Sequence, residues 1–343
     1  MGINHSKPAI PGKEYIDPNE DKFIEKIIQA FKKRLPDYYP PGETKRMFHP
    51  KMHGLVQATF SVSENLEEKY QQGIFKSGIE YPCWIRFSNA KKKPASDSKK
   101  DMRGMAIKLI GVPGKKMLKN HENEITHDFL LVTSKTLQTR SVHDFQKSLT
   151  ALMAGGIKLM WYALTHIDVV VKSVKQISKC SNLLETPFYS TTPYRFGTDE
   201  SIAVKYAVFP QNSKINSMPI EHTKNFLKKQ LHNDLLHSDY YFDFAVQFQE
   251  DATLMPIEDP TVEWTSPFIK LATIKIHKQH FTSTAQEAYG ENLSFTPWHC
   301  LKEHQPIGGV NRARKAVYVA LAAFRHQLNV QADKEPVHIE NFN

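Results

Sequence analysis

The hydrophobic pattern of this chain changes between a two-residue period and a helical period. In 55–62, Val56, Ala58 and Phe60 alternate with polar residues, as in a strand with one buried face. In 267–277 the apolar phase shifts midway, which predicts a β-bulge. Strands are predicted at 55–62, 82–88, 105–112, 127–132, 202–209, 241–249 and 267–277.

Four other segments carry apolar residues at helical spacing. The first, 20–35, places Ile24, Ile27 and Phe31 on one face and is ended by prolines. The last begins at Asn311, a residue type that can cap a helix. Helices are predicted at 20–35, 143–178, 219–237 and 311–328.

The order of these elements predicts the fold class. Strands cluster early and again late, without regular alternation of strand and helix. This favours an α+β fold with an antiparallel β-barrel core and surrounding helices. We divide the chain into an N-terminal segment with an amphipathic helix (1–39), a main domain (40–328) and a tail (329–343). Residues 1–18 and 329–343 are expected to be loose.

Composition narrows the choice of partners. The 343 residues carry a formal charge of +9, which suits an anionic ligand or surface, and nucleic-acid motifs are absent. The three cysteines are far apart, which argues against a disulfide scaffold and fits a reducing, cytoplasmic location. The N-terminus has no apolar core typical of a secretory signal. It does match the N-myristoylation pattern through Gly2 and Ser6, so that modification stays open.

The most apolar segment is 149–171, interrupted by Lys158, His166 and Asp168. A membrane span needs about 20 apolar residues with few charges, so a transmembrane helix is the third choice. A buried helix or the interface of a homodimer is the first interpretation. A helix lying on a membrane surface is the second.

The predicted C-terminal helix carries an unusual stripe. At about 100° per residue, Arg314, Tyr318, Leu321 and Arg325 fall on one side, beside small alanines. One interpretation is a core tyrosine between two arginines with buried stems. The other is a phenol that the Arg314 cation holds ionised. An ionised tyrosine is one of the known proximal haem ligands.

Several stretches resemble haem catalases. "KRMFHPKMHGLVQATFSV" (45–62) is similar to their distal-histidine strand, and "YPCWIRFSNA" and "DMRGMAIKLIGVPGKK" are similar to their Arg-Phe-Ser and Arg-Gly-x-Ala-x-Lys segments. Residues 185–197 and 293–325 resemble the short catalase-like haem proteins, which include catalase-related peroxidases and the coral allene oxide synthase. The resemblance covers roughly 40–328 and implies a catalase-like haem-binding fold with one haem b.

The resemblance implies roles for the cationic residues and the tyrosine. Tyr318 takes the place of the proximal iron ligand, and Arg314 that of the arginine that keeps the phenol deprotonated. Arg325, Arg46 and Arg86 correspond to positive groups near the two haem propionates, which makes chemical sense for a dicarboxylate ligand.

On the distal side, the resemblance assigns His49 as the acid/base and Ser88 as its hydrogen-bond partner. A zinc pair of His49 and His53 is the rival, but a strand would separate the two rings and no HExxH glutamate is present. We expect Thr133 where catalases carry an asparagine. Its shorter side chain predicts weak catalase turnover.

The leading functional hypothesis is a peroxidase-like haem enzyme. It would act on hydrogen peroxide or an organic or lipid hydroperoxide, with a small organic electron donor. An enzyme that rearranges fatty-acid hydroperoxides is the first alternative, supported by the apolar segment 149–171. A haem-binding protein with little turnover is the second, supported by Thr133.

Overall fold

The structure of the protein is a computed structural model that describes residues 9–91, 93–211 and 223–342. The myristoylation motif at Gly2 lies outside these residues. All seven predicted strands and the four predicted helical regions correspond to regular elements within the described chain. The α+β class is therefore confirmed.

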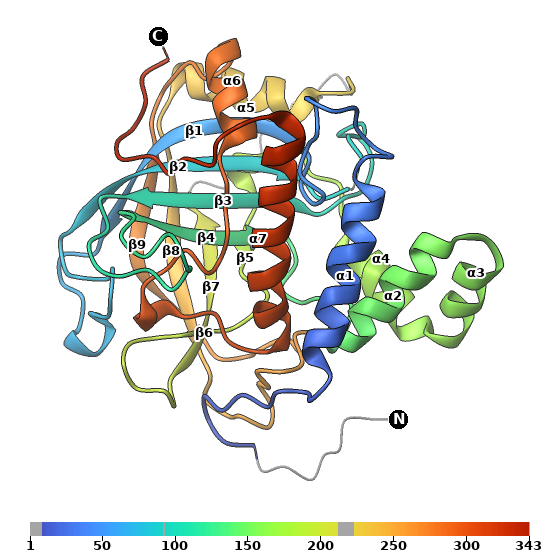
Figure 1. The fold of residues 1–343 in the computed structure, drawn as a ribbon. Coiled ribbons are helices and arrows are strands. Elements are labelled where there is room, and N and C mark those ends of the chain that lie inside the picture. The colour runs from blue at the N-terminus through green and yellow to red at the C-terminus, as the bar shows by residue number, and fades with distance from the viewer. Residues whose placement is uncertain (1–8, 92, 212–222, 343) are drawn as a thin grey trace.

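The strands form an antiparallel barrel (Figure 1). β5 pairs with both β4 and β7, which closes a ring of eight strands, and β6 adds to β7 outside the ring. The predicted bulge is confirmed in β9, where Leu271 is skipped in the register with β8. The strands are β1 (Lys51–Val62), β2 (Glu80–Asn89), β3 (Arg103–Ile110), β4 (Thr126–Val132), β5 (Phe188–Tyr189), β6 (Tyr194–Arg195), β7 (Ala203–Pro210), β8 (Tyr240–Phe248) and β9 (Phe268–Ile276).

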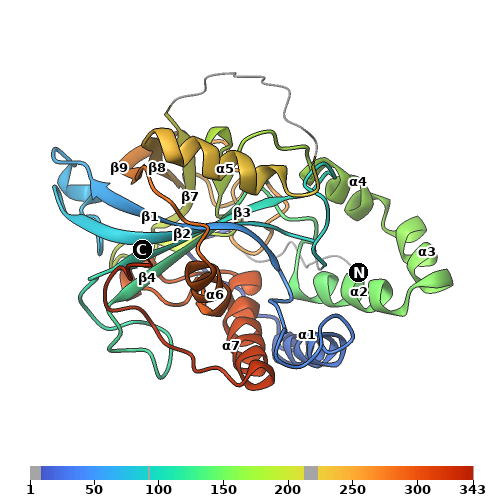
Figure 2. The same cartoon turned by 90° about the horizontal axis from the view of Figure 1, so that it is seen from above.

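Helices lie on opposite sides of the barrel, with α5 on one side and α1, α6 and α7 on the other (Figure 2). The helical pattern predicted over 143–178 forms three helices, because the chain breaks at Gly155 and Gly156, both with positive φ, and again at His166. The helices are α1 (Glu20–Arg34), α2 (Val142–Ala154), α3 (Gly156–Thr165), α4 (Ile167–Gln176), α5 (Phe226–His237), α6 (Thr284–Asn292) and α7 (Gly309–Asn329).

Aromatic side chains fill the inside of the barrel. Phe244 packs against Phe129 and Phe60, with ring centroids 4.8 and 5.1 Å apart. Tyr206 contacts Phe129 at 5.0 Å, and all four rings are buried. Because the interior is a packed core, a ligand of any size must bind outside the barrel wall.

The N-cap of helix α7 lies three residues earlier in the chain than predicted. Gly308, with a φ of 88°, is its N-cap, so the expectation that Asn311 caps the helix is wrong. Asn311 is instead buried in the first turn, where its amide donates to the carbonyls of Pro193 at 2.8 Å and Ile307 at 3.0 Å. The start of α7 is thereby tied to the loop after β5.

The expectation that both ends are loose is wrong for the described residues. Glu14 accepts a hydrogen bond from the backbone N–H of Gly308 at 2.7 Å. At the other end, Glu335 pairs with Lys108 at 2.7 Å, and the ring of Phe342 packs on Trp84. The tail therefore covers the outer face of β2 and β3.

Lys108 is the cation that holds the tail on the barrel. It is fully buried and lies 2.7 Å from both Asp128 and Glu335. Burial alone lowers the pKa of a lysine, but the two carboxylates raise the pKa of Lys108 to about 12.

We predict that Lys108→Met destabilises the protein by roughly 3–5 kcal/mol, because it leaves buried carboxylates without their cation. The matched control is Lys135→Met, which breaks an exposed pair with Glu263 and should cost below about 1 kcal/mol. Urea unfolding measures both. Equal effects of the two substitutions would contradict the proposed role of Lys108.

Candidate functional site

A cavity of about 580 Å³ lies between the outer face of the barrel wall and helices α1 and α7. Ile27 and Phe31 of α1 and Ala313 and Val317 of α7 pack together and line it. The resemblance to catalases gives roles to eight residues, and seven of these also line this cavity. They are Arg46, His49, Arg86, Ser88, Arg314, Tyr318 and Arg325.

His49 sits just before β1 in the left-handed region, with a φ of 57°. Its Nδ1 lies 3.0 Å from the Ser88 hydroxyl, and its carbonyl accepts from Arg86 at 3.1 Å. A Cβ on Gly104 would lie 2.5 Å from the His49 Nδ1, so only glycine leaves room for the ring. The ring position is thus set by β2 and β3 together.

The electrostatic surroundings keep the His49 imidazole neutral. Burial, followed by the guanidinium groups of Arg86, Arg314 and Arg46, lowers the pKa of His49 to about 3. A neutral imidazole has one protonated nitrogen and one lone pair, so it can accept a proton from one group and pass one on. The neutral imidazole is the form from which a general base starts.

Across the cavity, Arg314 and Tyr318 lie one turn apart on α7. The Arg314 Nη2 donates to the Tyr318 hydroxyl at 3.3 Å, and the guanidinium lies 5.3 Å from the ring centroid. Thr192 and Asn311 accept from the other end of the guanidinium at 3.3 and 3.2 Å. Burial alone would lower the pKa of Arg314, but Tyr318 and Tyr194 raise it, so the cation is stabilised beside the phenol.

Three further arginines gather at one end of the cavity, and two of them share a single carboxylate. Glu291 lies 3.5 Å from Arg46 and 3.9 Å from Arg86, while Arg325 donates to its backbone carbonyl. Arg86 and Arg325 are almost fully buried. Burial, together with the charge of Arg86, lowers the pKa of Arg325 to about 10. We call Arg46, Arg86 and Arg325 the arginine cluster.

The arginine cluster has unmet hydrogen-bonding capacity. Nη1 of Arg46 and both Nε and Nη2 of Arg86 are buried without a hydrogen-bond partner among the described residues. Three guanidinium groups stand against the one carboxylate of Glu291; Asp333 is partly exposed and pairs with His326. Buried cations need anionic partners, so the cluster suits a ligand with two carboxylates.

Thr133 is placed differently from the other seven residues. Its hydroxyl accepts from the backbone N–H of Arg103 at 3.1 Å, just past the end of β4, and its side chain is not among those that line the cavity. Gln138 and Thr139, on the irregular segment that follows, do line it. That segment has no hydrophobic periodicity, so the sequence did not predict a role for these two polar residues.

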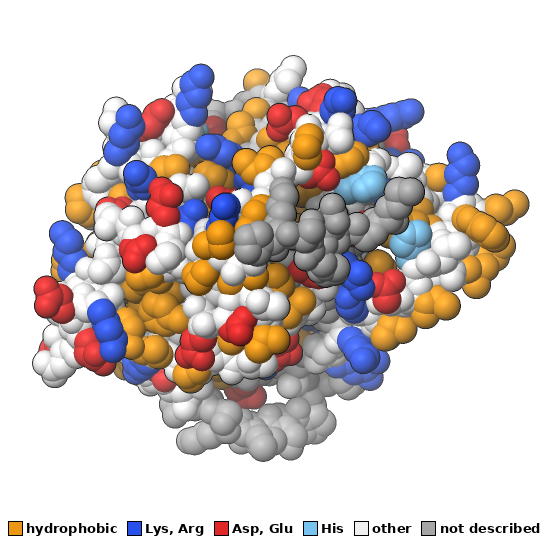
Figure 3. All heavy atoms as spheres, turned by 90° about the horizontal axis from the view of Figure 1, so that it is seen from below, with side chains coloured by type: hydrophobic (Ala, Val, Ile, Leu, Met, Phe, Trp, Pro, Cys, Tyr) orange, Lys and Arg blue, Asp and Glu red, His pale blue; other side chains and the backbone are white. Residues whose placement is uncertain are grey.

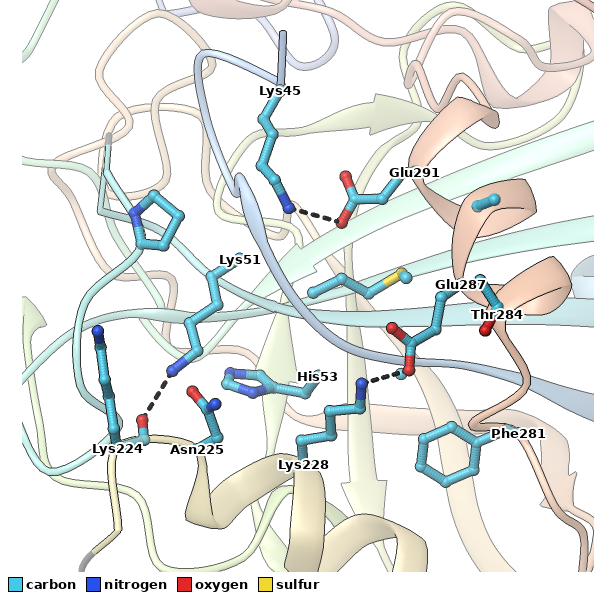
Figure 4. A pocket seen from close by; sticks show the side chains of 14 residues that line it. Lys45, Lys51, His53, Lys224, Asn225, Lys228, Phe281, Thr284, Glu287 and Glu291 are labelled. Carbon is cyan, nitrogen blue, oxygen red and sulfur yellow. Dashed lines mark hydrogen bonds and ion pairs between the residues drawn. The ribbon is translucent and has the colours of Figure 1, made fainter. Parts of the chain in front are cut away.

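A second cavity, of about 500 Å³, lies beside β1, α5 and α6 (Figure 4). Lys45 points to Glu291 at 3.6 Å, Lys228 pairs with Glu287, and Lys51 donates to the Lys224 carbonyl at 2.9 Å. Its charges are thus largely met by the chain itself, unlike those of the arginine cluster.

His53 lines this second cavity, whereas His49 lines the first. The His53 ring is buried and bonds Asn89 at 2.6 Å, so β1 holds the two histidines apart, as expected. Among the described residues, no group of three or more His, Cys, Asp or Glu side chains is arranged to hold a metal ion. A zinc site at these histidines has no support.

The closed barrel with a cavity between its wall and a long C-terminal helix defines a catalase-like fold. No protein-family model and no curated protein sequence matches the chain. Solved structures of catalases do match it. A fungal catalase matches with a TM-score of 0.66 over 96% of this chain and 70% of its own, at 15% identity. A bacterial catalase matches with a TM-score of 0.63 over 97% of this chain and 67% of its own. Catalase A from Saccharomyces cerevisiae matches with a TM-score of 0.66 over 95% of this chain and 70% of its own, and both are 15% identical to it.

We predict that Gly104→Ala is destabilising because its methyl group strikes the His49 ring. Overpacking of this kind costs about 1–3 kcal/mol. Most of that cost should disappear in a His49→Ala background, where the ring is absent, and the double-mutant cycle reports the coupling. If Gly104→Ala lowers the free energy of unfolding equally with and without the His49 ring, contact with that ring is not the reason that position 104 requires glycine.

Proposed function

We propose that the cavity binds one haem b and that the protein is a peroxidase-like haem oxidoreductase. The observation that carries this proposal is the arginine cluster, whose N–H groups without hydrogen bonds and surplus positive charge suit the two propionates of a haem. Nearer the start of α7, Arg314 and Tyr318 suit the proximal side. When bound, haem supplies a ferric iron that reacts with peroxides.

Tyr318 is the proposed iron ligand. A phenolate is required for that role, and the Arg314 guanidinium donates a hydrogen bond to the Tyr318 oxygen at 3.3 Å. Thr192 and Asn311 hold the guanidinium in place, so its charge is fixed before any ligand arrives. The proximal side therefore depends on hydrogen bonds that start outside α7.

His49 is the proposed acid/base. It would accept the proton from one oxygen of the hydroperoxide and return a proton to the other oxygen, which leaves. Its ring is positioned by Ser88 and by the missing side chain of Gly104. Because burial and the surrounding arginines lower its pKa, its lone pair is available well below pH 7.

The cavity wall favours peroxidase-like turnover over fast dismutation. Leu130, Val132, Leu137 and Phe145 line it, so an organic hydroperoxide or an organic electron donor finds apolar contacts. Dismutation needs a second hydrogen peroxide held in a fixed orientation. Thr133 does not line the cavity, so we propose weak catalase activity and leave Thr133 out of the catalytic set.

We predict that the apoprotein prefers haem to haem dimethyl ester, because the ester cannot offer carboxylates to the arginine cluster. Charged hydrogen bonds contribute about 1.5–3 kcal/mol each, so Arg86→Leu should lose about 10-fold or more of this preference. Arg86→Lys keeps the charge and should retain part of it. Binding titrations followed by absorbance measure both ligands. Equal affinities in the wild type would refute the proposed site.

We predict that hydroperoxide cleavage by the haem-loaded protein is nearly constant between pH 5 and 8. A histidine with an ordinary pKa of about 6.5 would lose about 30-fold of its neutral form at pH 5, whereas the lowered pKa of His49 keeps it neutral. His49→Gln should slow cleavage by about 10²–10⁴-fold with unchanged haem content. A steep fall below pH 6.5, or an active glutamine variant, places the base elsewhere.

A further inference from the structure

Helices α3 and α4 project from the body of the molecule, beyond α2 (Figures 1 and 2). Neither has a buried residue, although both are rich in apolar side chains. In each helix four large apolar residues repeat at i, i+3, i+4 and i+7, so they share one face. On α3 these are Ile157 (79% exposed), Met160 (58%), Trp161 (68%) and Leu164 (62%), and on α4 Ile167 (62%), Val170 (39%), Val171 (44%) and Val174 (58%).

Basic residues outnumber acidic residues in the segment that carries these two apolar faces. Residues 140–179 contain six lysines and arginines but only two acidic residues, of which Asp168 lies 3.7 Å from Arg140. In Figure 3, hydrophobic side chains gather over the protruding end of the molecule, with Lys and Arg side chains beside them. The six basic residues are Arg140, Lys147, Lys158, Lys172, Lys175 and Lys179.

The length of the helices restricts what covers these faces. Each has ten residues, and no helix in the described chain is long and apolar enough to cross a bilayer. Short amphipathic helices with a basic border lie in the interface of a membrane, with their apolar side chains about 5–10 Å deep. Pairing of two copies would instead bring like charges together, which disfavours association.

We propose that α3 and α4 form a membrane-docking surface for bilayers that contain anionic phospholipids. The apolar faces remove eight large side chains from water, and the lysines meet the negative headgroups. Trp161 is the residue type that anchors proteins at the level of the headgroups. This proposal is independent of haem, because it rests only on residues 140–179.

The docking surface also has a structural link to the cavity. Val142 and Phe145 of α2 line the cavity, and α2 packs against α3. A docked molecule therefore holds one wall of its cavity close to the lipid. Resting on the proposed function, we infer that the hydroperoxide substrate is a lipid hydroperoxide delivered from the bilayer.

Vesicle flotation of the haem-loaded protein tests docking. We expect binding to vesicles of phosphatidylcholine with about one fifth phosphatidylglycerol, weaker binding to pure phosphatidylcholine, and release by salt. The double variant Ile157→Glu/Trp161→Glu should bind at least 10-fold less, since it removes two large apolar anchors. Leu254→Glu, 66% exposed and outside these helices, is the matched control. Unchanged flotation of the double variant overturns the proposal.

Trp161 provides a second readout. It is 68% exposed, whereas the other three tryptophans, Trp84, Trp264 and Trp298, are at most 4% exposed. Vesicles with brominated acyl chains should therefore quench Trp161 emission, and Trp161→Phe should abolish the effect. A wild type that sediments as a dimer, does not bind vesicles and becomes monomeric in the double variant would show that a second copy covers the surface instead.

Turnover separates docking from the proposed chemistry. In the double variant, cleavage of a phospholipid hydroperoxide embedded in vesicles should fall about as much as vesicle binding does. Cleavage of water-soluble cumene hydroperoxide should stay at the wild-type rate. If the double variant loses turnover only of the vesicle-embedded substrate, lipid delivery is supported. If the double variant cleaves both substrates at the wild-type rate, lipid delivery is overturned. A wild type that binds vesicles but cleaves neither substrate refutes the proposed function and leaves docking in place.

Discussion

The excess of buried positive charge around one apolar cavity is the constraint on which the rest of this structure depends. Arg46, Arg86 and Arg325 lie at one end, and two of them share the carboxylate of Glu291. Isolated buried cations are costly, and their pKa values are lowered by burial and by one another. An arrangement of this kind is stable with an anion in place, which is why a dicarboxylate ligand accounts for it better than packing does.

The fold explains why the cavity lies where it does. Aromatic rings fill the barrel, so the outer face of β2, β3 and β4 becomes one wall, and α7 is held across it by contacts with α1. The same outer face carries Lys108, whose pairs with Asp128 and Glu335 bring the C-terminal tail back onto the barrel. Wall, helix and tail are thus fixed by side chains that point away from the barrel axis.

Local patterns were sufficient to predict the seven longer strands and the stripe of α7, because both depend on residues close together in the sequence, but not the two-residue strands β5 and β6. Arg314, Tyr318, Leu321 and Arg325 do line one cavity. Residues whose roles depend on distant partners were not foreseen. Glu291 pairs with arginines from two other segments, and Gly104 makes space for a ring more than fifty positions away. Gln138 lies on a segment without a hydrophobic period. Thr133, placed by resemblance alone, bonds the backbone of Arg103 instead.

The absorption spectrum of the haem-loaded protein tests the central claim most directly, with Tyr318→Phe as its partner. The account predicts a high-spin ferric spectrum with tyrosinate character in the wild type, and loss of that character, or of the haem, in the variant. Arg314→Lys keeps a cation beside the phenol and should retain the wild-type spectrum in large part. A haem spectrum that is the same in the wild type and in Tyr318→Phe, or a wild type that binds no haem, would contradict it.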